Sequence, residues 1–303
     1  MSLTSFVTLP DVKAKLRLLH PKLPRRLPVQ IQVEPRSDRF SLLGTAFDYL
    51  LRFDIQRRSP HAVASRWVAE AAPEIVWRQI GSASVGLDLL RDADPKRYLP
   101  PAKVALRMRA ILEAATAAVA AHLTRQVPNA GELADLAAHA IRLAKLDPVY
   151  RAGRLEPGFD EANAGDAGEL VALLTVVPFD AFPLHEPLLL NPNFGQTSEL
   201  VGGADADLIA GDLLADFKTT KKGEIEVGNL DQVPGYLLLA RKQRSVDPAF
   251  PEIRRIGLYF CRHGYLWTAP ASDWTAHPTF VDVEKWFWER AGQLRVTPGG
   301  GAK

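Results

Sequence analysis

Residues 200–219 contain two short runs in which apolar and polar side chains alternate, on either side of Gly211 and Asp212. Alternation with a period of two is typical of a strand that is buried on one face. A glycine followed by an aspartate between two such runs is a signal for a two-residue turn. The pattern therefore predicts a β-hairpin with strands over 200–209 and 213–219.

The rest of the chain shows helical periodicity or short apolar runs. Apolar spacing of three and four residues, or Ala- and Leu-rich composition with few breakers, predicts helices. They cover 41–56, 102–123, 131–146, 166–177, 229–242 and 281–294. Short β-rich runs predict further strands over 187–191, 255–261 and 265–269. Residues 1–39 carry five prolines and no sustained period, which predicts loops and short extended pieces.

The predicted hairpin gathers charged side chains on one face. If the two-residue turn forms, Asp207 faces Asp216 and Asp205 faces Lys218, and opposed residues share a sheet face. Charged side chains are rarely buried unless they are paired or bind a metal. Carboxylates are the ligands of hard divalent cations such as Mg²⁺. The sequence therefore predicts a site of three carboxylates and one ammonium group.

The spacing of these residues matches a known nuclease pattern. Asp207 lies on one predicted strand, Asp216 and Lys218 form a D-x-K on the next, and Gln232 and Tyr236 form a Q-x-x-x-Y on the following helix. The ordered set resembles the PD-(D/E)xK nuclease superfamily, and within it the RecB-type exonuclease branch. Residues four apart on a helix share a face, so Gln232 and Tyr236 point the same way.

Two positions of the pattern have an alternative or depart from it. Asp205 is the alternative first acid, because Gly203-Ala204-Asp205 also fits the family's small-residue lead-in. Upstream, Gly44-Thr45-Ala46-Phe47-Asp48 is similar to the family's G-x-x-x-H helix, with Asp48 in place of the usual His. An aspartate can still ligate Mg²⁺.

The resemblance implies an α/β fold with a restriction-endonuclease-like core, in which a mixed sheet is flanked by helices. It implies hydrolysis of DNA phosphodiester bonds with Mg²⁺ or Mn²⁺. The metal ligands that it implies are Asp48, Asp205, Asp207 and Asp216. Lys218 would orient or polarise the attacking water, and we expect a neighbouring cation and burial to lower its pKa. Gln232 and Tyr236 would hydrogen-bond a phosphate or the surroundings of Lys218.

We expect residues 1–39 to be a basic, proline-containing segment. Residues 40–303 would form a single nuclease-like domain with an Ala-rich helical insertion over about 56–165. Net charge is only +2, but residues 1–60 hold 11 Lys and Arg against 5 Asp and Glu. A basic cluster at residues 13–26 can neutralise phosphates or can form a solvated segment.

Composition excludes several classes of protein. Apolar and charged fractions of 47% and 24% are those of a globular protein, and no run of 18 apolar residues predicts a membrane helix. The single cysteine, Cys261, suits a reducing cytoplasm and cannot form an internal disulfide. Two other hypotheses stay open. The chain could be a catalytically inactive DNA-binding protein, or it could bind a partner, such as a helicase or another repair or defence subunit, through its Ala-rich region.

Overall fold

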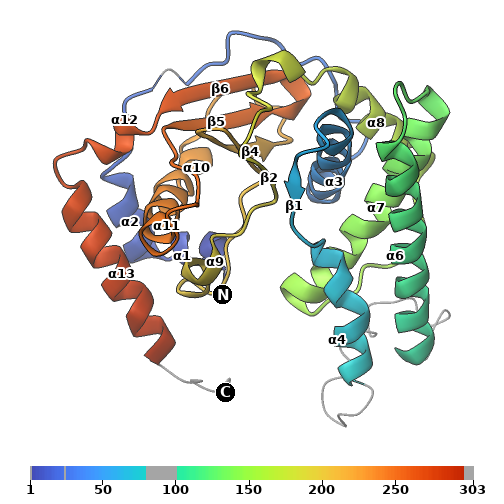
Figure 1. Cartoon of the computed structure of the whole chain (residues 1–303), viewed down its shortest axis with the longest axis horizontal. Helices are drawn as coiled ribbons and strands as arrows, with labels where there is room; N and C mark the ends of the chain where they lie inside the picture. The colour runs from blue at the N-terminus through green and yellow to red at the C-terminus, as the bar shows by residue number, and fades with distance from the viewer. Residues whose placement is uncertain (1, 24, 80–100, 297–303) are drawn as a thin grey trace. The chain divides into compact units, whose positions relative to one another are not determined.

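The computed structural model describes residues 2–23, 25–79 and 101–296 (Figure 1). The chain divides into two compact units. Unit 1 comprises Met1–Ile31, Pro178–Lys218 and Lys222–Lys303. Unit 2 comprises Gln32–Val177 and Thr219–Lys221. The fold is mixed α/β, as expected from the sequence. Unit 2 covers more of the chain than the helical insertion that we expected over about 56–165, because it also contains the predicted helix at 41–56.

A mixed sheet forms the centre of unit 1. Its strands are β2 (Leu188–Leu190), β3 (Leu208–Ala210), β4 (Leu213–Lys218), β5 (Arg255–Phe260) and β6 (Tyr265–Pro270), and they neighbour one another in chain order. β4 and β5 are parallel, while the other neighbouring pairs among β2–β6 are antiparallel. A parallel pair needs a crossover, and α10 (Val227–Leu230) and α11 (Val233–Val246) lie in it.

The predicted hairpin register is confirmed at the β3–β4 turn. The paired residues are Ala210 with Leu213, Ile209 with Leu214 and Leu208 with Ala215. Gly211 has a φ of 56°, a left-handed value that glycine adopts without steric cost. The local turn chemistry therefore fixes which residues of the two strands face each other.

The prediction of a strand over 200–209 is wrong for the first part of that range. The chain instead forms α9 (Gly195–Glu199) and then turns at Gly202 and Gly203, whose φ values are 82° and 110°. Two successive residues with positive φ do not continue a strand, and regular pairing with β4 begins at Leu208. The expected pairing of Asp205 with Lys218 is therefore not formed, and Asp205 makes an isolated bridge to Asn193.

Two short helices occupy part of the N-terminal segment in which we expected loops. They are α1 (Leu3–Val7) and α2 (Pro10–Arg17). Pro10 is the first residue of α2, where the missing N–H has no helical partner to lose, so this proline starts a helix instead of preventing one. Both helices contribute buried side chains to the core of unit 1, so this part of the N-terminal segment belongs to the folded unit.

One hydrophobic core connects the elements of unit 1. It joins α1, α2, α11, α12 (Ser272–Thr275) and α13 (Phe280–Val296) to the sheet. Figure 1 shows α11 against the sheet, with α13 on its far side. The rings of Phe6 and Phe287 meet edge to face with centroids 5.1 Å apart, so the N-terminal helix packs directly on α13.

Unit 2 is mainly helical, as the Ala- and Leu-rich pattern predicts. Its described elements are α3 (Phe40–Arg58), β1 (Val63–Ala64), η1 (Val68–Ala71), α4 (Ala72–Gln79), α6 (Pro101–Leu123), α7 (Ala130–Ala152) and α8 (Ala164–Thr175). In unit 1, η3 (Phe179–Ala181) precedes the sheet and η4 (Cys261–His263) connects β5 to β6. Within residues 2–23, 25–79 and 101–296, none of the helices has the length and apolar character to cross a membrane.

Candidate functional site

Asp216 and Lys218 lie on the face of β4 that α11 covers. Leu214 of the same strand belongs to the hydrophobic core, together with Leu237 of α11. Alternate residues of a strand share a face, so Asp216 and Lys218 continue the face of Leu214. Asp216 is only 7% exposed, and its carboxylate forms an ion pair with the Lys218 ammonium. The apolar surroundings therefore hold one acid and one base together.

Asp207 lies at the point where β3 begins. The hairpin register, continued by one residue, places it opposite Asp216. Its Oδ2 accepts a hydrogen bond of 2.5 Å from the Phe217 N–H, which lies between Asp216 and Lys218 along β4. The side chain thereby takes the place of a main-chain partner at the end of the ladder. The structure brings the carboxylates of Asp207 and Asp216 to one end of the hairpin, as the sequence predicts.

The charge balance of this group raises the pKa of Lys218. Burial acts to lower the pKa, but the charge of Asp216, its hydrogen bond to Lys218 and the charge of Asp207 act in the opposite direction. The net direction is upward, whereas we expected a lowered value. That expectation took a neighbouring cation into account, and the protein alone surrounds the ammonium with carboxylates. Lys218 is therefore charged at neutral pH.

Tyr236 holds the loop that carries the alternative acid, Asp205. Its hydroxyl donates a hydrogen bond of 3.1 Å to the main-chain carbonyl of Asp205. The Tyr236 side chain is 5% exposed, and its ring stacks on Phe194 with centroids 5.9 Å apart. The Asp205 residue itself is exposed. Asp207 thus contacts β4 through its carboxylate. Asp205 contacts α11 through its main-chain carbonyl.

The N-terminal helix α1 holds both sides of this arrangement. Gln232 precedes α11, and its Nε2 donates a hydrogen bond of 2.8 Å to Thr4 Oγ1. The Leu3 N–H donates to the Gly203 carbonyl at 2.7 Å, two residues before Asp205. A Cβ on Gly235 would lie 2.9 Å from Leu3 Cδ1, so glycine permits the close approach of α1 to α11. Sequence reasoning missed Thr4, because the N-terminal pattern carried no signal for this contact.

Asp48 lies on α3 in unit 2, where Arg52 orients it. Arg52 Nη2 donates to Asp48 Oδ2 at 2.5 Å, and the guanidinium lies 4.6 Å from the centroid of the Tyr49 ring. The Tyr49 hydroxyl in turn donates to Asp147 Oδ1 at 2.8 Å. Burial is the main cause that raises the pKa of Asp147 to about 6, while the Tyr49 hydrogen bond opposes it. Asp48 therefore belongs to a chain of charged and polar contacts within α3 and α7.

Gly44 brings α3 close to the residue that follows β4. A Cβ on Gly44 would lie 3.7 Å from Thr219 Oγ1, and both residues belong to unit 2. Thr219 comes directly after Lys218 in the chain. This contact gives the glycine of the G-x-x-x-D motif a local role. The approach of Asp48 to Asp207 and Asp216 stays a prediction.

A second buried carboxylate, Asp54, fixes α3 within unit 2. Its two oxygens accept hydrogen bonds from Arg57 Nε at 2.8 Å and Arg58 Nε at 2.6 Å. His122 Nε2 of α6 lies 3.3 Å from Asp54 Oδ1. Burial acts to raise the pKa of Asp54, but these three partners hold it below its ordinary value. The spacings to Arg57 and Arg58 were readable from the sequence, whereas the partner on α6 was not.

The basic cluster at residues 13–26 is partly used in internal contacts. Arg17 makes a bidentate pair with Asp231, with Nε–Oδ1 and Nη2–Oδ2 distances of 2.7 and 2.8 Å. Lys13 Nζ lies 3.4 Å from the same carboxylate, and Lys15 lies over the Trp286 ring. These cations fix α2 on unit 1. A structural role therefore accounts for the first part of the cluster.

The acids on the hairpin fit a magnesium or manganese ion that is completed by water and substrate. Mg²⁺ is commonly held by one or two carboxylates together with waters and phosphate oxygens. Asp207 and Asp216 supply two carboxylates at one end of the hairpin. In the described part of the chain, no group of three His, Cys, Asp or Glu side chains is placed to hold a metal ion. Asp207 and Asp216 are therefore the two carboxylates on the hairpin that could hold such an ion.

Comparison of the chain with protein families, with curated proteins and with solved structures finds no match.

Proposed function

We propose that this protein is a metal-dependent nuclease that hydrolyses the phosphodiester bonds of DNA. The observation that supports this proposal best is the convergence of Asp207, Asp216 and Lys218 at one end of the β3–β4 hairpin. The strand order with a helical crossover between β4 and β5 agrees with the fold that the motif resemblance implies. Tyr236 of α11 holds the main chain at Asp205, and Gln232, which precedes α11, holds Thr4 of α1.

Each residue of the group has a role in this proposal. Asp207 and Asp216 would hold Mg²⁺ or Mn²⁺, with Asp48 as a further ligand. The ion would act as a Lewis acid and lower the pKa of a bound water. Lys218, charged at neutral pH, would contact a phosphate oxygen and offset its negative charge. Tyr236 and Gln232 would keep the surrounding loops in place.

A nuclease assay tests the proposal directly. Purified protein is incubated with linear, circular and single-stranded DNA in Mg²⁺, Mn²⁺ or EDTA. We expect cleavage with either metal and none with EDTA. DNA binding without cleavage under all conditions would instead favour the inactive DNA-binding protein. Absence of both binding and cleavage would leave the partner-binding hypothesis.

Thr4→Val should lower kcat severalfold and lower the free energy of unfolding by no more than about 1 kcal/mol. The variant removes the hydrogen bond to Gln232, and a neutral hydrogen bond contributes about 1 kcal/mol, or roughly fivefold. Thr4 is exposed, so its loss removes little packing. Steady-state cleavage and thermal unfolding are measured together. Thr4→Ser should restore activity, and Thr8→Val, an exposed change in the same segment, serves as the control. A kcat of Thr4→Val equal to that of Thr8→Val would contradict the role of α1.

Asp48→Ala should reduce the stabilisation of the protein by Mn²⁺. A ligand that binds only the folded state stabilises by about 2.7 kcal/mol at 100 times its Kd, so a weaker site gives a smaller shift. The comparison uses the difference in Tm with and without Mn²⁺, because loss of the Arg52 partner lowers the Tm itself. Asp38→Ala, an exposed change in unit 2, is the control. An equal metal-induced shift in Asp48→Ala and wild type, with normal cleavage, would remove Asp48 from the site.

A further inference from the structure

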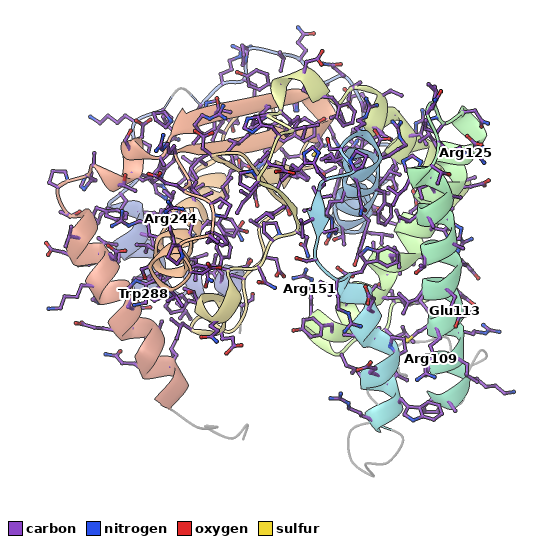
Figure 2. The ribbon with its side chains drawn as sticks, viewed as in Figure 1. Arg109, Glu113, Arg125, Arg151, Arg244 and Trp288 are labelled. Carbon is purple, nitrogen blue, oxygen red and sulfur yellow. The ribbon has the colours of Figure 1, made fainter. Side chains whose placement is uncertain are left out.

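Unit 1 contains an open cavity of about 670 Å³ that is separate from the acidic group on the hairpin. Its walls are the last turns of α11 and the segment 251–254, and residues of α12 and α13 complete it. Four basic side chains line it, against the two acids Glu252 and Glu284. The basic residues are Arg241, Lys242, Arg244 and Arg254. Figure 2 labels Arg244 on α11. The lining therefore carries a net positive charge.

Protein carboxylates offset only part of this charge, because Arg254 pairs with Glu252 at 2.9 Å and both side chains of that pair are exposed. Arg244 is held by neutral groups, since its Nη1 donates to the Phe250 carbonyl at 2.6 Å and to the Pro248 carbonyl at 3.4 Å. Among residues 2–23, 25–79 and 101–296, no carboxylate forms an ion pair with Lys242 or Arg244. Arg241 lies 3.4 Å from Glu284, a distance at which the pair is weak. Two cations of the cavity are thus available to an anionic ligand.

The other lining groups identify the anion as a phosphate ester. Ser272 and Thr275 add hydroxyl groups beside the cations, while the Ser245 hydroxyl donates to the Lys242 carbonyl at 2.6 Å. Basic and hydroxyl side chains are the groups that contact phosphate oxygens and sugars in nucleic-acid complexes. None of the described lining residues is aromatic, so the cavity offers no ring on which a base could stack. Contacts of this kind hold a nucleic-acid backbone without reading its sequence.

The cavity lies at the opposite end of α11 from the proposed active site. Gln232 precedes the helix, and Arg244 is on its last turn. Twelve residues of α-helix span about 18 Å. With about 3.4 Å between phosphates along one strand of a duplex, this distance corresponds to roughly five nucleotides. The middle of α11 is buried, so the helix sets the distance between the two sites, and a single strand of about five nucleotides is long enough to span it.

We propose that this cavity binds the phosphodiester backbone of a single nucleic-acid strand, about five nucleotides from the bond that is cleaved. The proposal rests on the proposed nuclease function for the location of that bond. Its walls hold the strand between Arg241 and Lys242 on one side and Arg254 on the other. The cavity acts as a second, sequence-independent contact that retains the substrate while the acidic group acts on it.

The test compares the double variant Arg241→Gln/Lys242→Gln with wild type and with the control Lys103→Gln/Lys285→Gln. The control removes two positive charges from exposed positions outside the cavity lining. Binding of a fluorescent single-stranded 20-mer is measured by anisotropy in EDTA, at several salt concentrations. Loss of two phosphate contacts should weaken binding about tenfold near physiological salt and reduce the slope of log K against log salt by about 1.4.

Substrate length gives a second, independent readout. With an oligonucleotide that extends only about two nucleotides beyond the acidic group, wild type and the cavity variant should bind equally. Equal affinities and salt slopes for the 20-mer in wild type and the cavity variant would overturn the proposal. Equal weakening in the control variant would also overturn it, because charge alone would then explain the effect.

Binding in EDTA separates this proposal from the proposed function. Normal Mg²⁺-dependent cleavage with unchanged binding in the cavity variant refutes the cavity and leaves the nuclease intact. Weaker binding of the 20-mer by the cavity variant, with no cleavage by wild type, supports the cavity and refutes the nuclease. Competition by a free mononucleotide as strong as that by the 20-mer, at equal phosphate concentration, would identify a nucleotide pocket and refute the strand-binding site.

Discussion

Asp216→Asn and Lys218→Ala are each expected to reduce DNA cleavage at least about a thousandfold, while the protein stays folded. Asp216→Asn keeps the shape of the side chain and removes the charge that would hold the metal. Lys218→Ala removes the ammonium that forms the ion pair with Asp216 and would offset phosphate charge. Cleavage of labelled DNA in Mg²⁺ and Mn²⁺ gives the rate, and circular dichroism with thermal unfolding verifies the fold.

The same hairpin provides a matched control for these variants. Asp212 lies in the turn at the other end of the hairpin and pairs with Arg255 at 2.6 Å. Asp212→Asn changes the same chemical group away from the acidic cluster, so its cleavage should stay close to that of wild type. Near-normal cleavage by Asp216→Asn or Lys218→Ala would refute the proposed mechanism. Loss of folding in these variants, with a folded Asp212→Asn, would show that the ion pair is structural.

Asp54→Ala is expected to lower the free energy of unfolding by about 3–5 kcal/mol. Asp54 is 1% exposed and is the common partner of Arg57, Arg58 and His122, so its removal leaves the largely buried Arg57 guanidinium without its counterion. Urea denaturation of the full chain gives the change. Asp135→Ala on α7 replaces an exposed aspartate and should change stability by less than about 0.5 kcal/mol.

The free energy that Asp54 contributes to folding depends on pH, because its pKa differs between the folded and the unfolded state. The pKa of Asp54 in the folded state lies below that of an ordinary aspartate, which is near 3.8. The folded state therefore favours the charged form, and the contribution is fully present above that ordinary value. It is lost as the pH falls below about 4, because the unfolded chain takes up the proton first. Asp54→Ala should show a smaller loss of stability between pH 5 and pH 3 than wild type. An equal loss in both proteins would contradict the assignment.

The parts of the fold that local sequence decides could be predicted. Alternation of apolar and polar residues with the Gly211-Asp212 turn predicts the β3–β4 register, because both signals concern residues that are neighbours in the chain. The Ala- and Leu-rich segments predict α6 and α7 for the same reason. The pairing of Asp207 with the Phe217 N–H then follows from the register.

Contacts between distant parts of the chain could not be predicted. Thr4 and Gln232 are 228 residues apart, and no local pattern connects them. The prolines of the N-terminal segment indicated loops, whereas Pro10 begins a helix that tertiary packing stabilises. The direction of the Lys218 pKa also depended on which charges surround it in three dimensions, and the sequence alone suggested the opposite sign.

Unit 1 is built from three separate segments of the chain. Its core can therefore form only after the last of these segments has been synthesised. Residues 1–31 are translated before the rest of unit 1, and the partners of α1 at Gly203 and Gly235 follow only after residues 32–177 of unit 2. Until then, the apolar side chains of α1 have no core to enter. Unit 2 consists almost entirely of one continuous segment, so it can fold before α1 finds its partners. The helix α1 is thus translated before unit 2 and reaches its native contacts only after the later segments of unit 1 have been made.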